Sequence, residues 1–129
     1  MLEPVSPNPA TDSKLAYSQG IIAHGETRTL YIAGQVGADA SGTVSPDFEA
    51  QARQGWSNLV GVLTAANMKV SDLIKVTAFL TNAADYPVYA KVRSEFLGGH
   101  KPTSTLLVVA ALALPAWKFE IEGVAVTTK

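Results

Sequence analysis

The chain has no cysteine among its 129 residues, and it has few charged residues of either sign. Without cysteine there is no disulfide bond, no thiolate nucleophile and no cysteine-ligated metal site. Charged residues make up 16% of the sequence and the net charge is −1, with no basic run or stripe. Such a charge pattern argues against nucleic acid as a partner. The absence of cysteine also fits a reducing compartment, so we expect a cytoplasmic protein.

A long hydrophobic segment is missing as well. The longest uncharged aliphatic run, residues 106–114, has nine residues, whereas a membrane-spanning helix needs about 20. Residues 1–14 contain three prolines and neither the basic nor the apolar region of a signal peptide. We interpret them as an extended arm that precedes one domain, residues 15–129, and we expect no contact with a membrane. With two histidines and no cysteine, no metal site and no cofactor are predicted.

The pattern of apolar and polar residues predicts strands and helices in a mixed order. Strands are predicted at residues 15–23, 28–37, 72–81, 104–113 and 117–127. The first two are separated by the turn sequence His-Gly-Glu-Thr, which predicts a hairpin. One helix is predicted over 47–67 with Ser45 as its N-cap, and another over 85–96 that ends at Gly98. The resulting ββαβαββ order is typical of an α+β domain.

Two helices can cover only one face of such a sheet. The run 106–114 is apolar at every position, so both faces of that strand need burial, and the chain has no third layer to supply it. We therefore expect further copies of the same protein to cover the far face. In the last strand, Trp117, Phe119 and Ile121 are predicted to face the helices. Lys118, Glu120 and Glu122 would then face the partner subunit, where a carboxylate in a cleft between subunits predicts a small-molecule site.

Four stretches of the chain resemble the Rid family, the YjgF-type reactive intermediate deaminases. They are Ala-Tyr-Ser-Gln-Gly at 16–20, Tyr-Ile-Ala-Gly-Gln-Val-Gly at 31–37, the long segment 51–92, and the closing segment 118–126. Each motif alone is weak, but their order and spacing are specific. The resemblance implies a chorismate-mutase-like α+β subunit with a mixed sheet and two helices on one face. It also implies a homotrimer with a central β-barrel and a small-molecule ligand in each cleft between subunits.

The resemblance further implies a site. In active members of the family, water attacks the C=N carbon of an imino or enamino acid and ammonia leaves. By motif position, the catalytic glutamate that helps to hold the water is Glu120, and the pocket is lined by Tyr17 and Gly34. The family's arginine, which clamps the substrate carboxylate, is absent, and Ser104 stands in its place. Serine offers one neutral donor where arginine offers a charged, bidentate fork, so a standard 2-imino acid is not expected to be the substrate.

Two neighbours complete the predicted substrate-binding set. The hydroxyl group of Thr105 could donate a hydrogen bond in the cleft, and backbone groups near Thr105 and Leu106 would orient the substrate. Lys101 is a weak candidate to replace the lost cation at the cleft mouth, and His100 is a candidate to reach the same place.

The sequence thus predicts a trimeric hydrolase that deaminates an imine, an enamine or a related reactive metabolite. The alternative is a non-catalytic trimer that binds a metabolite or another protein, because Ser104 removes the carboxylate clamp. Glu120 could also be a structural charge paired with Lys118, and Tyr17 could simply pack against the sheet. Arg93 is expected on the solvent side of the second helix or in a salt bridge.

Overall fold

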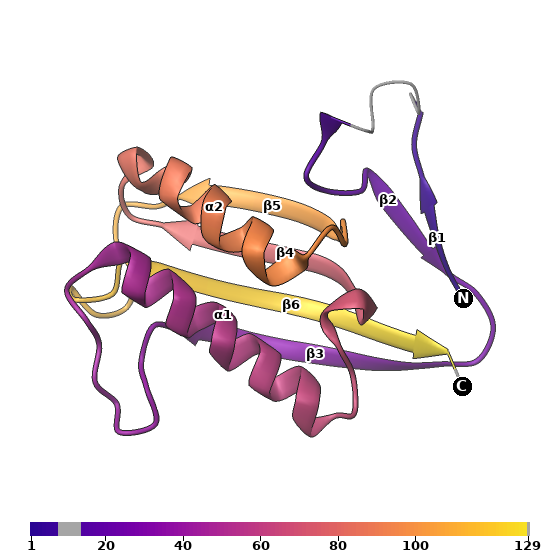
Figure 1. Ribbon diagram of the computed structural model, residues 1–129, viewed down its shortest axis with the longest axis horizontal. Coiled ribbons are helices and arrows are strands. Elements are labelled where there is room, and N and C mark those ends of the chain that lie inside the picture. Colours follow the sequence, from indigo (N-terminus) through magenta and orange to yellow (C-terminus); the bar gives the residue numbers. More distant parts are fainter. Residues whose placement is uncertain (8–13, 129) are drawn as a thin grey trace.

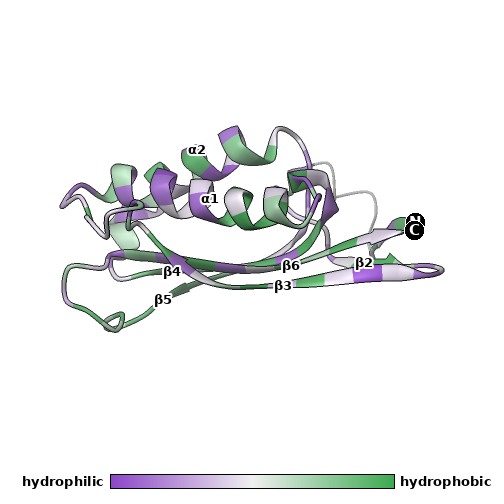
Figure 2. Cartoon of the chain, turned by 90° about the horizontal axis from the view of Figure 1, so that it is seen from below, coloured by the Kyte–Doolittle hydropathy of each residue, from purple (hydrophilic) through white to green (hydrophobic). Residues whose placement is uncertain are grey.

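Two helices lie on one face of a four-stranded sheet, and the opposite face carries no helix (Figures 1 and 2). The computed structural model describes residues 1–7 and 14–128. The elements are β1 (Leu2–Val5), β2 (Gly20–Ala23), β3 (Thr27–Val36), α1 (Phe48–Ala65), β4 (Leu73–Leu80), α2 (Tyr86–Leu97), β5 (Thr103–Val108) and β6 (Phe119–Thr128), with short 3-10 helices at Val70–Asp72 and Ala83–Asp85. The sheet has the order β3-β6-β4-β5, in which only β4 and β5 run parallel. The predicted α+β class and mixed sheet are confirmed.

The predicted hairpin between the first two strands is wrong. β2 pairs with β1 in a separate two-stranded sheet, and β3 pairs with β6 at the other end of the sequence. The register from Thr27 opposite Thr128 to Ile32 opposite Gly123 places Ile32 in the core beneath α1, and such packing outweighs a local turn signal. The predicted arm therefore begins with a paired strand, while its residues 8–13 lie outside the described residues.

The two helices form close to their predicted bounds. Asp47, not Ser45, is the N-cap of α1, because the Asp47 carboxylate accepts a hydrogen bond from the Ala50 N–H at 3.0 Å. Asp47 lies one residue before the helix, where its side chain reaches the first free backbone donors. Gly98 ends α2 with a φ of 57°, as predicted, because glycine adopts this left-handed conformation without steric cost.

The core lies between the helices and the sheet. Its largest fully buried side chains are Trp56, Leu59 and Leu63 from α1, Tyr89 and Val92 from α2, Leu73, Val76 and Leu80 from β4, and Phe119 and Ile121 from β6. The Phe119 ring lies 5.5 Å from the Tyr89 ring and 6.1 Å from the Phe48 ring, measured between centroids. Phe119 and Ile121 therefore face the helices, as predicted from their alternation.

The alternation of β6 does not extend to its predicted start. Lys118 does not project onto the uncovered face, because its Nζ donates to the Pro46 carbonyl at 2.7 Å. Its backbone N–H donates to the buried Gln51 side chain at 2.8 Å. Trp117 lines a hollow with Thr81 and the loop after β5 instead of facing the helices. Trp117 and Lys118 come before β6 begins, so the predicted alternation of the strand does not include them.

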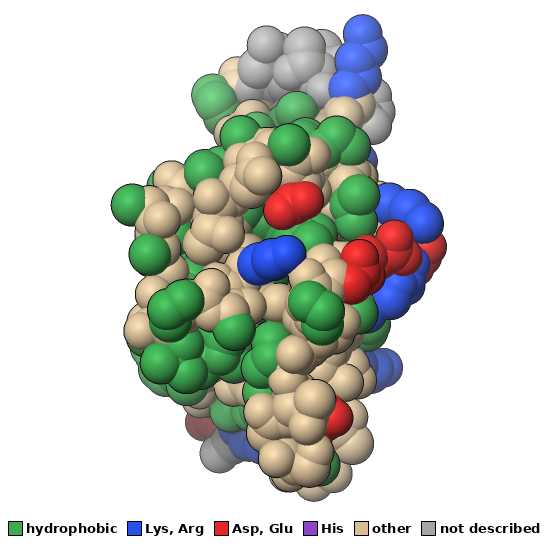
Figure 3. Space-filling view, turned by 90° about the vertical axis from the view of Figure 1, so that its left-hand side faces the viewer, with side chains coloured by type: hydrophobic (Ala, Val, Ile, Leu, Met, Phe, Trp, Pro, Cys, Tyr) green, Lys and Arg blue, Asp and Glu red, His purple; other side chains and the backbone are tan. Residues whose placement is uncertain are grey.

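The long apolar run is only partly a strand. β5 ends at Val108, so the strand predicted over 104–113 is too long. Val108 is 53% exposed and Leu114 is 51% exposed, and hydrophobic side chains gather at this end of the molecule (Figure 3). No helix within the described residues is long and apolar enough to cross a membrane.

The buried Tyr89 hydroxyl predicts a loss of stability at alkaline pH. Burial raises the pKa of Tyr89 from 10.0 to about 12, although the nearby Arg93 cation opposes the rise. The unfolded chain therefore loses this proton at a lower pH than the folded chain, and the free energy of unfolding falls between these two values. At about 1.4 kcal/mol per pKa unit, the loss is roughly 2–3 kcal/mol.

Urea denaturation at about pH 9 and about pH 12 measures this loss. Tyr89→Phe is the matched variant, because it removes the titrating hydroxyl group and keeps the buried ring. We expect the variant to lose less stability than the native chain over this range. An equal loss in both proteins would contradict the assignment.

Candidate functional site

The carboxylate of Glu120 lies against the backbone of Gly34 on the uncovered face. Glu120 in β6 stands between Val36 of β3 and Phe79 of β4. A Cβ atom added at Gly34 would lie 1.9 Å from the Glu120 Oε2 atom and 2.9 Å from its Cδ atom. The register of β3 shifts between Ile32 and Gln35, and Gly34 falls inside this irregularity. The predicted catalytic carboxylate and the predicted glycine are therefore neighbours in one chain.

Glu120 is half-buried and carries no compensating cation. Lys118 is engaged by the Pro46 carbonyl, so the ion pair between Lys118 and Glu120 that we considered does not form. The Glu120 carboxylate forms no hydrogen bond or ion pair with any residue in the described part of the chain. Its carboxylate oxygens are thus free to accept hydrogen bonds from a water molecule or a ligand.

The rest of the uncovered face is a mixture of apolar and polar side chains. Tyr31 of β3 is 78% exposed and Leu107 of β5 is 44% exposed. Glu122 is exposed opposite Thr77 in β4. Thr105, a predicted binding residue, also lies on this face, and its hydroxyl accepts a hydrogen bond from Lys75 Nζ at 2.5 Å. This face of the sheet thus carries exposed apolar side chains beside polar and charged ones.

Ser104 and Leu106 project to the opposite, helix-covered side. Ser104 pairs with Val76 and Leu106 pairs with Ala78, two residues buried in the core. Paired residues of neighbouring strands point to the same side of a sheet, so the Leu106 side chain packs against the core and does not line a cleft. Ser104 itself lies on β5, the strand at one edge of the sheet.

The backbone groups of these two residues point away from the sheet. Val109 N–H donates to the Leu80 carbonyl at 2.8 Å, so the odd-numbered residues of β5 direct their backbone groups toward β4. Alternate residues of a strand direct them to opposite edges. The N–H and C=O groups of Ser104 and Leu106 therefore face the open edge of the sheet, where a ligand or a partner can use them. This arrangement supports the predicted orienting role of the backbone near Leu106.

Tyr17 lies at the beginning of that same edge. The adjacent Ser18 N–H donates to the Pro102 carbonyl at 2.9 Å, one residue before β5. Tyr17 lines a hollow of about 560 Å³ together with His100, Lys101 and apolar residues of β1 and β2. The His100 Nε2 atom lies 2.7 Å from the Leu73 carbonyl, which only accepts, so this nitrogen carries the hydrogen.

The predicted residues therefore form two groups that one chain does not bring together. Glu120 and Gly34 lie on the uncovered face of the sheet. Tyr17 and Ser104 lie toward the start of β5, and Ser104 projects from the other face. A single site made from both groups needs two chains. Within the described residues, no cluster of three or more His, Asp or Glu side chains could hold a metal ion.

Arg93 is the residue of interest that sequence reasoning misplaced. The prediction put it in solvent or in a salt bridge, yet it is half-buried and forms no ion pair within the described residues. Its guanidinium carbon lies 5.5 Å from the centre of the Tyr89 ring. The i, i+4 spacing of Tyr89 and Arg93 on one helix face was the signal that could have located it.

The close approach of Gly34 and Glu120 predicts that their substitutions interact. Gly34→Ala forces the Glu120 carboxylate out of its position, and we expect a destabilisation of about 1 kcal/mol, typical of the coupling between contacting residues. In the Glu120→Ala background this cost should disappear, because the obstructing atoms are gone. Urea denaturation of the four proteins in the cycle at one fixed concentration measures the coupling.

Gly61→Ala is the matched control for that cycle. Gly61 lies on α1 with open space around its Cα atom, so alanine should stabilise the helix by about 0.5–1 kcal/mol. An equal cost of Gly34→Ala with and without Glu120 would contradict the proposed contact.

Comparison with known proteins identifies the family. The model of the family described as Endoribonuclease L-PSP matches residues 8–127. The 2-iminobutanoate/2-iminopropanoate deaminase of Rattus norvegicus is 33% identical over 113 residues, which cover 86% of this chain and 80% of the rat protein.

Solved structures agree with the family match. The Rid family protein YyfB of Yersinia pestis superposes with a TM-score of 0.84 at 28% identity, covering 96% of this chain and 97% of that one. Escherichia coli TdcF with bound serine superposes with a TM-score of 0.72 at 31% identity, covering 87% of this chain and 88% of that one. Sequence and fold together place this chain in the Rid family of YjgF-type proteins, the family that the model Endoribonuclease L-PSP describes.

Proposed function

We propose that this protein hydrolyses an imine or enamine to release ammonia, at clefts between the subunits of a homotrimer. The carrying observation is the half-buried Glu120 carboxylate, which lies against the backbone of Gly34 and has no partner among residues 1–7 and 14–128. A relative at 33% identity is named as a 2-iminobutanoate/2-iminopropanoate deaminase, which supports this class of reaction.

The chemistry asks little of the protein beyond holding water in place. Glu120 accepts a hydrogen bond from a water molecule and takes up its proton as the water oxygen bonds to the C=N carbon. The π electrons of the C=N bond move to nitrogen, which takes a proton from solvent and becomes an amine. The C–N bond of this carbinolamine then breaks as Glu120 returns its proton to the leaving nitrogen and the hydroxyl group gives up its proton to solvent, so ammonia and a carbonyl compound remain. A carboxylate partly removed from water is suited to this proton transfer.

The placement of the two residue groups supports an assembly of more than one chain. Glu120 and Gly34 on the uncovered face of one subunit would meet Tyr17 and the edge of β5 from another. The same contact would bury the exposed Tyr31 and other apolar side chains of this face, which gives the association a hydrophobic driving force.

Mass measurement tests the association. By light scattering at micromolar concentration, we expect three times the chain mass of 13.6 kDa. Leu107→Glu, which places a charge on the uncovered face, should shift the protein toward smaller species. Tyr86→Glu on α2 is the control, since Leu107 and Tyr86 are both 44% exposed. If the native protein is monomeric at this concentration, the proposal of a cleft shared between subunits is contradicted.

We propose that the substrate is not a standard 2-imino acid, because the strand position that would hold its carboxylate carries no arginine. Ser104 offers one neutral hydroxyl group at that position, and it cannot form the paired hydrogen bonds that arginine makes with a carboxylate. A neutral imine, or an acid held by a different cation, fits the site better. Ribonuclease activity is not proposed, because the net charge of −1 and the absence of a basic run give little attraction for RNA.

Ammonia release from freshly generated imines tests the reaction. Glu120→Gln keeps the shape of the side chain but removes its proton-accepting charge, and we expect kcat/KM to fall by roughly 100-fold or more. Glu122→Gln is the matched control, because Glu122 lies two residues away on the same face, and its activity should stay near the native value.

Two results would argue against an enzyme. The first is a rate no higher than that of buffer for any imine or enamine, and the second is an unchanged rate in Glu120→Gln. Binding of a metabolite by calorimetry without turnover would then favour the alternative, a trimer that binds without chemistry.

A further inference from the structure

We propose that Arg93 of α2 binds the anionic group of the substrate, in place of the arginine that is missing at Ser104. The inference rests on the proposed function, because the anion is taken to belong to the molecule that Glu120 hydrolyses. It adds a specificity-determining residue, which would select an imine or enamine that carries a carboxylate or a similar anion.

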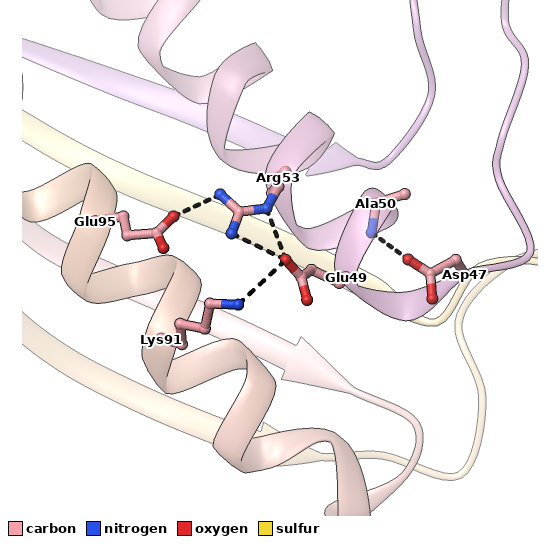
Figure 4. A network of polar contacts seen from close by, with 6 residues as sticks. All are labelled: Asp47, Glu49, Ala50, Arg53, Lys91 and Glu95. Atoms are coloured by element: carbon pink, nitrogen blue, oxygen red, sulfur yellow. Dashed lines mark hydrogen bonds and ion pairs between the residues drawn. The ribbon is translucent and has the colours of Figure 1, made fainter.

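The ion pairs between the helices show which way Arg93 points. Lys91 and Glu95 of α2 face α1, where Lys91 pairs with Glu49 at 3.6 Å and Glu95 pairs with Arg53 at 2.5 Å (Figure 4). Arg93 is two residues from each of them, which is about 200° around the helix. Its side chain therefore leaves α2 on the side away from α1. Because α1 packs on β3 and β6, that side lies toward β5, at the edge of the sheet (Figure 1).

The immediate surroundings of Arg93 leave part of its hydrogen-bonding capacity unused. The guanidinium carbon lies over the buried Tyr89 ring, 5.5 Å from the ring centre, which is within the range of a cation–π contact. Its Nε–H is buried without a hydrogen-bond partner within the described residues. A partly buried guanidinium group without a carboxylate partner is costly unless a further group binds it.

A hollow beside Arg93 connects it to the predicted substrate-binding residues. This hollow, about 300 Å³ in volume, is lined by Ala16, Arg93, Ser94, Leu97, Gly99, His100 and Lys101. Among the described residues that line it there is no Asp or Glu, whereas Arg93, Lys101 and the imidazole of His100 do line it. Ala16 directly precedes Tyr17, and Lys101 lies three residues before Ser104. The hollow therefore lies where the 16–18 segment meets the start of β5.

Ser104 and Arg93 also lie on the same side of the sheet. Ser104 projects from β5 toward the helix-covered side, because it pairs with the buried Val76. α2 lies over that half of the sheet (Figure 1). A guanidinium group carried by the strand in relatives can thus be replaced by one carried by the helix, with the anion held from above instead of from the sheet. The anion would then lie at a different place relative to Glu120, which agrees with a substrate other than a standard 2-imino acid.

The test compares the binding of acids with that of their neutral amides. We choose 2-oxobutanoate and 4-oxopentanoate, which hold the carboxylate at two distances from the carbonyl carbon, and measure each against its amide by calorimetry or by NMR shifts. The native protein should bind at least one acid roughly tenfold more tightly than its amide, because arginine pairs with a carboxylate through two charged hydrogen bonds. Arg93→Met should lose this preference, while methionine can still pack on the Tyr89 ring.

Lys91→Met is the matched control, since it removes a cation from the other side of α2 and should keep the preference for the acid. Arg93→Lys keeps the charge but not the fork, so its preference should be intermediate. The proposal is overturned if the native protein prefers neither acid to its amide, or if the preference survives in Arg93→Met. Thermal unfolding confirms that each variant is folded before binding is compared.

A second variant asks whether Arg93 replaces residue 104. Ser104→Arg in the Arg93→Met background should restore both the preference for the acid and the release of ammonia from acidic imines. A failure to restore binding, in a folded protein, would show that the two positions do not serve the same anion.

The outcomes separate this inference from the proposed function. If the protein prefers an acid through Arg93 but turns over no imine, the anion site is supported and the proposed enzymatic function is contradicted. If neutral imines are turned over in a way that depends on Glu120 but not on Arg93, the proposed enzymatic function is supported and the anion site is contradicted.

Discussion

A four-stranded sheet with both helices on one side has one face that its own chain leaves uncovered. In this protein that face carries Tyr31, Leu107 and the carboxylate of Glu120 in the same surface. Apolar groups favour association and an unpaired carboxylate opposes it, because burying a charge without a partner is costly. The two tendencies are compatible if association buries the apolar groups and leaves a cleft at the carboxylate. The same uncovered face then accounts for both the proposed oligomer and the proposed site.

The position of the carboxylate depends on a missing side chain. The Glu120 oxygens occupy the space that a Cβ atom would take at Gly34, and the irregular pairing between Ile32 and Gln35 brings that backbone into place. Glycine within a strand weakens it, so a regular sheet has no use for one here. A strand that accepts this cost to hold a carboxylate beside its backbone is better explained by a site than by stability alone.

Periodicity predicted the parts of the fold whose packing is local. The stripe that includes Trp56 and Leu59 predicted α1, and the alternation of Phe119 and Ile121 predicted which face of β6 the helices cover. The predictions that were wrong missed contacts between distant segments. The structure pairs β1 with β2, and it joins Lys118 to Pro46 by a hydrogen bond. The family motifs pointed to Glu120 and Gly34, which are neighbours on one face of the sheet. Nothing in the local sequence predicts that Ser104 projects from the opposite face.

Arg93 shows why a missing residue in a motif is weak grounds for a missing function. A motif records which position carries a charge, whereas a ligand responds to where the charge lies in space. On β5, a guanidinium group at residue 104 would extend from the sheet toward α2. The helix α2, which carries Arg93, lies over the same half of the sheet (Figure 1), and the guanidinium carbon lies 5.5 Å from the centre of the Tyr89 ring. Moving the cation from strand to helix keeps the charge on that side but changes its distance from the carboxylate that holds the water. Specificity for the position of the anion within the substrate can therefore change while the reaction itself is retained.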